Sequence, residues 1–460
     1  MNNKFYLLRT ILIYGLFIST YGLQSCNKFL EKKSNNSLVT PTNLSDLQAL
    51  LDENVQMNNS SSSLGETACD DYFLAQDRLN ALIVNYQELY LWRLHQYTDG
   101  DWLYTSRPIY ICNLVLERIK NIENNAGNLN AYNNVIGSAL FFRSYYFLSL
   151  LWDYGKAYDG STAKTDLGIM LRTNSDFNVN FQRASVQDCY DFIIKDVKKS
   201  ISLLPNFPQI QTRPSKIAAY GLLARTYLSM RDYRNALLYA DSCLNLKSDL
   251  LDFNDPDEVA IASTASFTQF NNETILFSTF AQTPYGFFMP SKPGYVDTTV
   301  YSSFDENDLR KQAYFRPDGS GYYIFKGSYS TKNNLEIFTG LATDEMYLIR
   351  AECYIRTGQV NLGLNDLNKL LSTRWKTGTY TPVYNLNAED ALELVLKERR
   401  KEMIYRGTRW SDIKRLNKEG YNINLIRKAG DEVYKLEAGS SYFALPFPSD
   451  LIKITGIQQN

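Results

Sequence analysis

The stretch KIAAYGLLARTYLSMRDYRNALLYADSC, residues 216–243, indicates how this chain folds. Apolar residues recur in it at helical spacing, and the small residues Ala224 and Ala236 stand on either side of a short polar turn. Small side chains at these positions allow two antiparallel helices to approach closely, and Tyr227 would fill the groove between them. The stretch therefore predicts a helical pair over residues 213–246, of the kind found in tetratricopeptide repeats.

The same pattern returns later in the chain. Ala351 and Tyr354 occupy the positions of the first small residue and the aromatic residue, and Gly363 follows in the next predicted helix. This copy predicts a helical pair over residues 343–372. More degenerate units are predicted near residues 132–155 and 388–416. Because long segments separate the copies, the sequence favours helical pairs interrupted by insertions over a continuous solenoid.

The helical period is lost over residues 251–341, where Gly, Pro, Ser and Tyr accumulate. Two short alternating runs in this segment, residues 274–280 and 322–326, are typical of strands. Further helical patterns cover residues 44–51, 101–121 and 185–203. The sequence therefore predicts a mainly α fold, built from several helical pairs and carrying a long irregular insertion with a few short strands.

Composition excludes several classes of protein. The chain has 460 residues, of which 44% are apolar and 21% charged, as in a typical soluble globular protein. Lys and Arg number 48 against 49 for Asp and Glu, so the net charge of −1 provides no basic field for nucleic acid. Aromatic residues make 14% of the chain. Composition leaves open whether this aromatic excess packs the interior or lines a binding surface.

The start of the chain is expected to be a targeting segment. Lys4 and Arg9 precede an apolar run, residues 11–18, which is too short to span a bilayer and is typical of a signal peptide. The run is followed by Leu23-Gln24-Ser25-Cys26, which is similar to a bacterial lipobox, so Cys26 is the predicted lipidation site. Ordinary signal cleavage, with Cys26 incidental, is the alternative.

The chain is therefore expected to have three parts. Residues 1–25 are the predicted lipoprotein signal peptide, 26–64 the lipidated N-terminus with a flexible tether, and 65–460 a single folded domain. The tether is predicted from polar runs such as Asn58-Asn59-Ser60-Ser61-Ser62-Ser63, which carry little apolar surface to bury. An acylated chain of this kind would be anchored to a membrane without crossing it.

The usual catalytic constellations are absent from the sequence. His95 is the only histidine, and neither a G-x-S-x-G motif nor a phosphate-binding glycine motif occurs. Clustered His and Cys residues, which a zinc site requires, are also missing. We therefore expect no enzyme activity, no cofactor and no metal, although residues 97–101 could hold an ion weakly. The five cysteines after Cys26 are expected to be buried and unpaired.

Two features could still suggest catalysis or nucleic-acid binding. A glycosidase needs only two carboxylates, and Asp70-Asp71 is the most visible pair. Adjacent residues rarely face each other across a scissile bond, so a capping or hydrogen-bonding pair is the preferred interpretation. The basic run 397–415 contains Glu398 and Glu402 at helical spacing, which favours a salt-bridged helix face over a nucleic-acid surface.

Five motifs, in chain order, resemble those of the SusD/RagB family of outer-membrane nutrient-binding lipoproteins. They are Trp102 with Asn113-Leu114-Val115-Leu116, then Phe142-Arg143-Ser144-Tyr145-Tyr146-Phe147 with Tyr154-Gly155, then Lys216 to Arg225, then Glu398-Arg399-Arg400-Lys401-Glu402 with Arg406-Gly407-Thr408-Arg409-Trp410-Ser411-Asp412, and finally Leu445-Pro446-Phe447-Pro448 with the ending Gln458-Gln459-Asn460. The resemblance covers nearly the whole chain after Cys26. Ser144 and Arg406 depart from the family's pattern, which has Ala and an acidic residue at these positions.

The resemblance implies a fold and a role. Members of the family lie over a SusC-like TonB-dependent barrel in the outer membrane and act as its lid during the uptake of glycans or peptides. Their tetratricopeptide helices form the scaffold and contact the transporter, which implies that the matched motif residues are structural. Their ligands bind in irregular loops through aromatic stacking and hydrogen bonds. A position facing the extracellular side is implied by the resemblance alone.

Two loop regions of this chain combine aromatic faces, which suit the C–H surfaces of sugars, with polar groups for hydroxyls. The candidate ligand-binding residues are Asp70, Asp71, Tyr72, Trp92, Tyr97, Tyr285, Phe287 and Tyr295. The alternative is that these aromatic residues pack the loops against the scaffold.

The leading interpretation is a non-catalytic, cell-surface glycan-binding lipoprotein that delivers oligosaccharide to a SusC-like TonB-dependent transporter. A peptide-binding lid of a RagAB-like importer, a lipid-anchored glycosidase and a helical-repeat adaptor that binds only protein are the alternatives. Nucleic acid is not an expected partner.

Overall fold

The computed structural model of this chain describes residues 41–97, 100–281, 294–331 and 336–460. The chain divides into residues 1–42 and a second unit, Asn43–Asn460. The predicted signal peptide and Cys26 belong to the first and lie outside the described residues. The fold that follows is that of the second unit.

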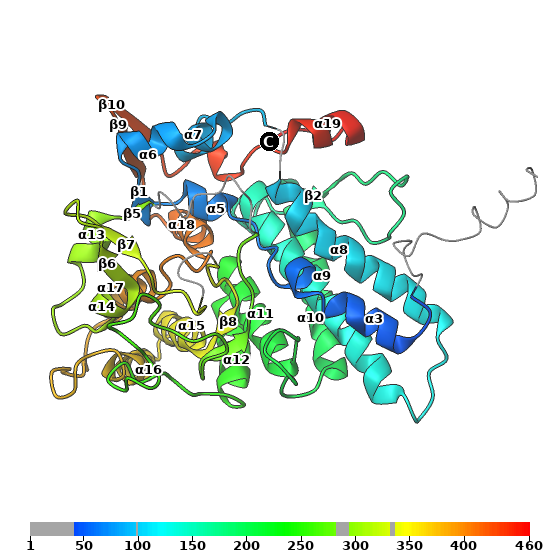
Figure 1. The fold of residues 1–460 in the computed structure, drawn as a ribbon, viewed down its shortest axis with the longest axis horizontal. Coiled ribbons are helices and arrows are strands. Elements are labelled where there is room, and N and C mark those ends of the chain that lie inside the picture. The colour runs from blue at the N-terminus through cyan, green and yellow to red at the C-terminus, as the bar shows by residue number, and fades with distance from the viewer. Residues whose placement is uncertain (1–40, 98–99, 282–293, 332–335) are drawn as a thin grey trace, which may run out of the picture. The chain divides into compact units, whose positions relative to one another are not determined.

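Long helices form the scaffold, and each packs on the next along the chain (Figure 1). Their order is α8 (Asp101–Arg118), α9 (Leu129–Tyr154), α10 (Val186–Leu203), α11 (Lys216–Ser229), α12 (Tyr233–Leu244), α15 (Thr343–Arg356), α16 (Val360–Ser372) and α17 (Ala388–Glu402). Side-chain oxygens of Ser185, Ser215 and Asp232 cap α10, α11 and α12 by accepting hydrogen bonds from first-turn amides. The prediction of a mainly α fold is confirmed.

The two clearest predicted helical pairs are present as α11–α12 and α15–α16. The rings of Tyr227 and Tyr239 stack between α11 and α12, with centroids 5.6 Å apart and an interplanar angle of 1°. Gly363 allows α16 to approach α15 closely, because a Cβ at this position would stand 2.6 Å from the carbonyl oxygen of Ala351. Small residues and an aromatic groove filler therefore act as the repeat pattern predicted.

The other two predicted pairs are wrong. The 132–155 unit is one uninterrupted helix, α9, which packs against α8 and α10. The 388–416 unit forms α17 and α18 (Arg409–Asn417), but α17 packs on α15 whereas α18 packs on α5 (Leu64–Ala68) and α9. Gly407, with a φ of 74°, lies in the turn between α17 and α18 and redirects the chain.

Helix α9 lies at the centre of the scaffold. By length and mean hydropathy, 1.3, it could cross a membrane, but 83% of its most apolar window is buried inside the fold. Its polar residues are paired, since Arg143 donates to Asp196 of α10 at 2.6 Å and to Asn113 of α8 at 2.8 Å. A helix that is apolar on all sides and surrounded by other helices is a core helix.

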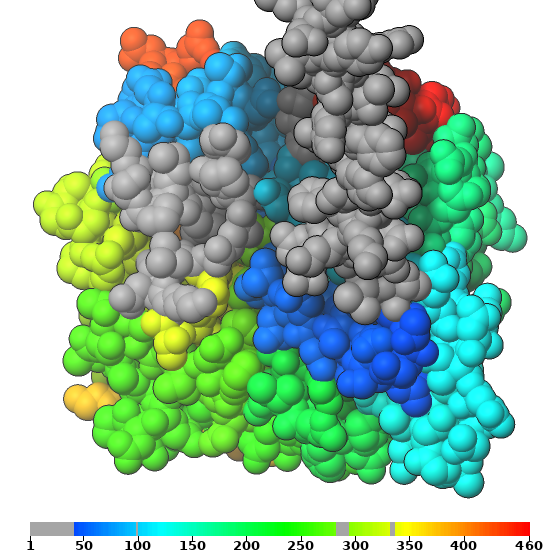
Figure 2. Space-filling view, turned by 45° about the vertical axis from the view of Figure 1, so that its right-hand side comes forward, coloured from blue at the N-terminus to red at the C-terminus, as the bar shows by residue number. Residues whose placement is uncertain are grey.

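The predicted tether is wrong between residues 43 and 64, because this segment is folded. Helix α3 (Leu44–Leu51), capped by the side chain of Asn43, packs on α8 and α9. Figure 2 shows α3, in dark blue, at the surface beside the cyan part of the chain. The folded unit therefore begins about twenty residues earlier than the predicted boundary.

The polar run 58–63, which follows α4 (Asn54–Met57), is part of the interior. Ser61 exchanges backbone hydrogen bonds with Thr279 and Ala281. The side-chain amide of Asn58 donates to the carbonyls of Thr212 and Phe277 at 3.0 and 2.8 Å. Composition suggested a solvated tether, but polar groups are stable in an interior that supplies their hydrogen-bond partners.

The strands are short and pair antiparallel in twos among the described residues. The ladders are β1 (Tyr72–Phe73) with β5 (Tyr295–Val296), β2 (Leu167–Met170) with β3 (Arg183–Ser185), β4 (Thr274–Leu276) with β8 (Leu341–Ala342), β6 (Phe315–Pro317) with β7 (Tyr323–Phe325), and β9 (Leu425–Ala429) with β10 (Glu432–Leu436). The two runs predicted as strands are present as β4 and β7. Shorter helices complete the unit: α6 (Gln76–Ala81), α7 (Val84–Tyr90), α13 (Thr298–Ser302), α14 (Arg310–Tyr314) and α19 (Ser449–Thr455).

Most of the basic run 397–415 packs into the interior, although Lys397 remains exposed. Its acidic residues Glu398 and Glu402 accept hydrogen bonds from Arg310, which is fully buried and comes from α14. Arg415, 1% exposed, pairs with Glu352 of α15 at 2.6 Å. The predicted ion pairs at helical spacing are present, as in Lys401 with Glu398 and Arg415 with Asp412. Further pairs join different elements, so the matched motif is structural.

The five cysteines of the described residues, Cys69, Cys112, Cys189, Cys243 and Cys353, are all buried and free, as predicted.

Candidate functional site

Three aromatic rings meet where β1, β5 and the β6–β7 turn come together, and we call them the aromatic cluster: Phe73, Tyr295 and Tyr322. Phe73 lies opposite Tyr295 in the β1–β5 ladder, with ring centroids 5.4 Å apart. Tyr322 closes the group at 5.0 Å from Phe73, edge to face, and at 4.9 Å from Tyr295. Tyr322 is 41% exposed, so the cluster presents an aromatic surface to solvent.

A guanidinium group from α6 covers the inner ring of the cluster. The Cζ atom of Arg78 lies 3.7 Å from the centroid of the Tyr295 ring. Its Nη2 donates to the hydroxyl of Tyr295 at 2.6 Å and to a carboxylate oxygen of Asp318 at 2.8 Å. The stacked and hydrogen-bonded guanidinium fixes the orientation of Tyr295, which is 5% exposed.

The polar edge of the site is a glycine-rich turn between β6 and β7. Gly319 and Gly321 have φ values of 89° and 94°, which other residues rarely adopt. The turn brings the hydroxyl of Ser320 to 2.5 Å from Asp318 and 3.1 Å from the hydroxyl of Tyr295. Hydrogen bonds from Ser320 and the charge of Arg78 lower the pKa of Asp318 to about 2, although burial acts to raise this pKa.

This arrangement suits binding better than catalysis. An exposed ring with a carboxylate, a hydroxyl and a guanidinium beside it offers a stacking face together with donors and acceptors for hydroxyl groups. With its pKa at about 2, Asp318 remains a carboxylate at neutral pH and accepts hydrogen bonds. The general acid of a glycosidase needs the opposite shift, a raised pKa that keeps its proton.

Among the predicted residues that the structure describes, Tyr295 alone belongs to this site. Tyr72, Trp92 and Tyr97 are 3%, 8% and 6% exposed, and their polar atoms are engaged by interior partners. The Trp92 indole donates to the carbonyl of Ala68 at 2.9 Å, and the hydroxyls of Tyr97 and Tyr154 lie 2.8 Å apart. Their burial agrees with the alternative that these aromatic residues pack the loops against the scaffold, and it argues against stacking with a ligand.

Two of the other predicted residues, Tyr285 and Phe287, lie outside the described residues. Residues 97–101 were predicted to be able to hold an ion weakly, but Asp101, the last of them, does not face an ion site. Asp101 is fully buried and accepts hydrogen bonds from the backbone amide of Ser63 at 2.9 Å and from its hydroxyl at 3.2 Å. This carboxylate caps an interior segment.

Asp70 and Asp71 have different surroundings, although they are neighbours. Arg409 and Arg400 contact Asp70 at 2.7 and 2.9 Å, and against the effect of burial they hold the pKa of its carboxyl below the usual range. Asp71 is 1% exposed, and burial raises its pKa to about 7 although Arg400 acts in the opposite direction. Asp70 thus ties the segment before β1 to α17 and α18, whereas Asp71 makes no hydrogen bond to these arginines.

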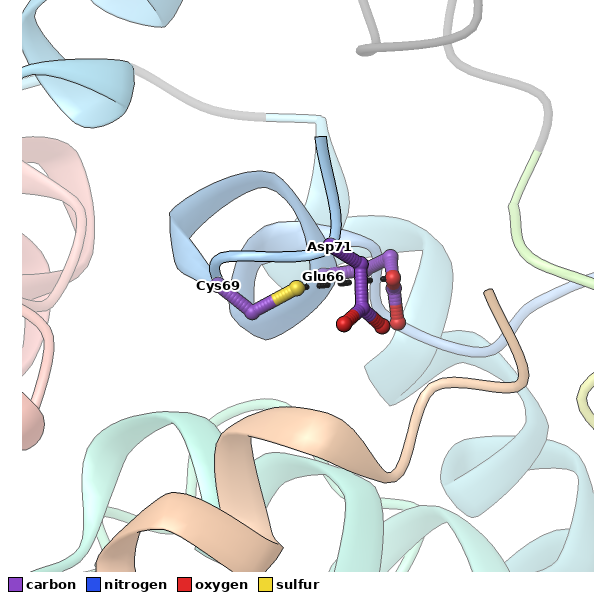
Figure 3. A group of neighbouring side chains, drawn as sticks. All are labelled: Glu66, Cys69 and Asp71. Atoms are coloured by element: carbon purple, nitrogen blue, oxygen red, sulfur yellow. Dashed lines mark hydrogen bonds between the residues drawn. The ribbon is translucent and has the colours of Figure 1, made fainter. Parts of the chain in front are cut away.

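Asp71 also belongs to a buried acidic group with Glu66 and Cys69, whose side chains converge in the segment before β1 (Figure 3). Their potential ligand atoms lie within 4.8 Å of one another, and the thiol donates to Glu66 at 3.5 Å. Burial, and then the charge of Asp71, raise the pKa of Glu66 well above its usual value. A cation here would face the guanidinium groups of Arg400 and Arg409, which lie 3.8 and 3.9 Å from Asp71, so the group fits a shared proton better than a metal.

The sequence did not predict Arg78, Asp318 or Tyr322 as site residues. A weak signal existed for Tyr322, which follows a Gly-Ser-Gly turn at the start of a predicted strand. Arg78 and Asp318 join the site only through the pairing of β1 with β5 and the β6–β7 turn.

Two family models match separate parts of the chain. A model described as "Starch-binding associating with outer membrane" matches residues 28–228, and the SusD family model matches residues 341–453. No curated protein matches the chain.

Solved structures with the same fold cover most of the chain. A SusD superfamily protein from Bacteroides thetaiotaomicron has a TM-score of 0.73 at 19% identity, covering 91% of this chain and 99% of its own. A SusD-like carbohydrate binding protein from Bacteroides vulgatus has a TM-score of 0.68 at 20% identity, with 90% and 97% covered. Surface glycan-binding protein A from Bacteroides uniformis has a TM-score of 0.64 at 16% identity, with 90% and 99% covered. With both family models matched in sequence and this fold in the structure, the chain belongs to the SusD/RagB family.

Proposed function

We propose that this protein is a non-catalytic glycan-binding lipoprotein of the outer membrane, and that the aromatic cluster is its oligosaccharide site. The observation that carries the proposal is the exposed ring of Tyr322, packed on Phe73 and Tyr295 beside the carboxylate of Asp318. Sugar rings stack their C–H faces on such aromatic surfaces, while their hydroxyls need nearby carboxylate and hydroxyl groups.

The relatives support this class of ligand. One family model carries starch binding and outer-membrane association in its description, and the similar structures include a carbohydrate binding protein and a surface glycan-binding protein. Each of these names describes another protein, and we extend the class, but no particular sugar, to this chain.

We further propose the cellular setting. Residues 1–25 act as a signal peptide, Cys26 carries the lipid anchor, and residues 43–460 form the domain that binds a SusC-like TonB-dependent barrel and delivers glycan to it. Rigid packed helices offer broad faces for such a partner, and the anchor confines both proteins to one membrane, which raises their effective concentration.

The test is a titration of the full chain with oligosaccharides, beginning with maltoheptaose and extending to cello-, xylo- and manno-oligosaccharides. Replacement of Tyr322 by Ala is expected to remove a stacking contribution of about 0.5–1.5 kcal/mol beyond area burial. This corresponds to about a three- to tenfold higher Kd by calorimetry. Tyr421→Ala is the matched control, because Tyr421 is 43% exposed and lies outside the aromatic cluster.

An unchanged Kd for Tyr322→Ala with a sugar that binds would contradict the assignment of the site. Accumulation of shortened sugars during the titration would contradict the non-catalytic role. Binding of peptides but of none of the oligosaccharides would favour the peptide-importer alternative.

A further inference from the structure

A groove opens beside α3, away from the aromatic cluster, and we call it the α3 groove. It lies between α3, the first turns of α9, the end of α10 and the connection from α10 to α11, and none of the residues of the aromatic cluster lines it. In Figure 1, α3 lies on the right of the view, whereas β1, β5 and β7 lie on the left. The groove has a volume of about 960 Å³, near the upper end of the range for small-molecule sites.

Polar side chains that line the groove are joined in one row of hydrogen bonds. The side-chain amide of Asn134, on α9, donates to the carbonyl of Gln48, on α3, at 2.9 Å, and the amide of Gln48 donates to Asp52 at 2.9 Å. Arg213 donates to both carboxylate oxygens of Asp52, at 2.8 and 2.6 Å, and to the carbonyl of Gln209. The row holds side chains from three segments of the chain in place before any ligand binds.

This row leaves hydrogen-bonding capacity for a ligand. Within the part of the chain that the structure describes, the side-chain carbonyl of Asn134 and the amide nitrogen of Gln209 make no hydrogen bond. Asn134 is half-buried and Gln209 is exposed. The side chains of Asp52 and Arg213 are 30% and 26% exposed. The groove therefore offers acceptors together with donors, which suits hydroxyl groups because each hydroxyl both donates and accepts.

The side chains that line the groove carry no net charge. Asp52 and Arg213 are the charged residues of the lining, and they neutralise each other in their ion pair. The other lining residues are Ser, Asn, Gln, Ala, Leu, Val, Pro and Phe. An ionic ligand would lose hydration here without gaining a free counter-charge, so the lining favours an uncharged polar ligand.

The connection from α10 to α11 adds an aromatic ring to the groove. Phe207 lines the groove and is 55% exposed. Pro205 and Pro208 flank it, and Pro208 also disfavours helical conformations of Phe207. An exposed ring in such a restrained segment can stack on the C–H surface of a sugar at a small cost in conformational entropy.

We propose that the α3 groove is a separate binding site and that its ligand is a neutral oligosaccharide. The row of hydrogen bonds supplies partners for hydroxyl groups, and Phe207 supplies a stacking surface. The matched charges of Asp52 and Arg213 select against an ionic ligand. The proposal rests on this groove alone and goes beyond the site assigned to the aromatic cluster.

The first experiment measures how many oligosaccharides one chain binds, by calorimetric titration of the full chain with maltoheptaose and with cello-, xylo- and manno-oligosaccharides. Ala131→Trp places a large side chain in the groove from an exposed position in the first turn of α9, and this variant is expected to bind one oligosaccharide fewer per chain. Ala388→Trp, at an exposed alanine in the first turn of α17, is the matched control and should bind as many as the parent. A number that is the same in Ala131→Trp and the parent for every sugar, zero included, would overturn the proposal.

A second variant tests the stacking surface. Phe207→Ala is expected to raise the Kd of the groove about three- to tenfold, because it removes the ring and leaves the row of hydrogen bonds in place. Tyr384→Ala is the matched control, since Tyr384 is 56% exposed and lies outside the groove. Equal Kd values for these two variants would overturn the proposal even if Ala131→Trp fails to fold.

The charge of the ligand provides the third test. Oligogalacturonate is expected to bind in the groove more weakly than the neutral oligosaccharides, because the lining holds no free counter-charge. Tighter binding of oligogalacturonate or of a peptide, lost in Ala131→Trp, would contradict the proposal. Tyr322→Ala should leave binding in the groove intact, so this site and the aromatic cluster succeed or fail separately.

Discussion

Asp153 on α9 shows how single buried residues make the stability of this protein depend on pH. It is 5% exposed; one carboxylate oxygen accepts from the amide of Gly65 at 3.1 Å, and the other has no hydrogen-bond partner. Burial raises its pKa from 3.8 to about 7, against the opposing charge of Lys414. The folded protein therefore retains a proton that the unfolded chain releases near pH 4.

The sign of the effect follows from this raised pKa. Asp153 favours folding below pH 4, and that contribution is lost as the pH rises towards 7. Asp153→Asn retains an oxygen acceptor and has no charge to bury. The variant is expected to gain stability relative to the parent between pH 4 and pH 8, on the order of 4 kcal/mol at about 1.4 kcal/mol per pKa unit. Urea unfolding at both pH values measures this, and a gain that is equal at pH 4 and pH 8 would contradict it.

Arg374 allows a second test at the scale of one residue. It is fully buried and donates to Glu273 at 2.6 Å and to Glu402 at 2.8 Å. Arg374→Met would leave both carboxylates buried without this partner, at an expected cost of about 3–5 kcal/mol in the free energy of unfolding. Arg93→Met is the control, since the side chain of Arg93 is 47% exposed and its pair with Glu88 is worth at most about 1 kcal/mol. If urea unfolding gave similar losses of unfolding free energy for Arg374→Met and Arg93→Met, burial of the ion pair would not determine its contribution.

At the scale of elements, the contact of α15 with α16 depends on the absence of a side chain. Gly363→Ala would place a Cβ 2.6 Å from both the carbonyl oxygen of Ala351 and a side-chain carbon of Ile355. In an isolated helix the change would stabilise by about 0.5–1 kcal/mol, but the forced separation is expected to cost about 1–3 kcal/mol. Thermal unfolding measures the sign. Gly160→Ala is the matched control, because nothing lies within 4 Å of its new Cβ.

The elements also show which parts of the fold are readable from sequence. The pair α15–α16 has the predicted outer bounds, residues 343 and 372, since periodic apolar residues and a short turn mark it. The run 58–63 was misassigned because its partners, such as Thr212 and Phe277, are remote in sequence. Pairing over such distances leaves no local pattern, and residue composition then favours a solvated segment.

The candidate site was predictable only in part, because long-range pairing brings most of its residues together. Tyr295 was found because aromatic and polar residues are dense around it in the irregular insertion. Arg78 lies on α6 and Tyr322 just before β7. The strands that bring them to Tyr295 have two or three residues and are too short to produce a periodic signal. Sequence identified the right segment of the chain, and long-range pairing selected the residues.

At the scale of the whole molecule, the proposed anchor at Cys26 is expected to have the largest effect on location. Cys26→Ser removes the proposed acylation site. The protein is then expected to leave the membrane fraction, because the lipid on Cys26 is the membrane attachment that we propose. Fractionation after a high-salt wash measures the distribution. The matched control is Cys69→Ser, at a buried cysteine inside the fold. Retention of Cys26→Ser in the membrane fraction would contradict lipidation at this position.

If Cys26 carries the proposed anchor, the folded segment that begins at Asn43 sets how far the domain could stand from the bilayer. A free chain from residue 27 to residue 64 could extend at most about 130 Å, whereas residues 27–42 alone could extend at most about 55 Å. In the proposed setting, with Cys26 acylated, a chain of the shorter length would keep the domain within about 55 Å of the membrane surface. A ligand captured there would be close enough to pass directly to a neighbouring barrel.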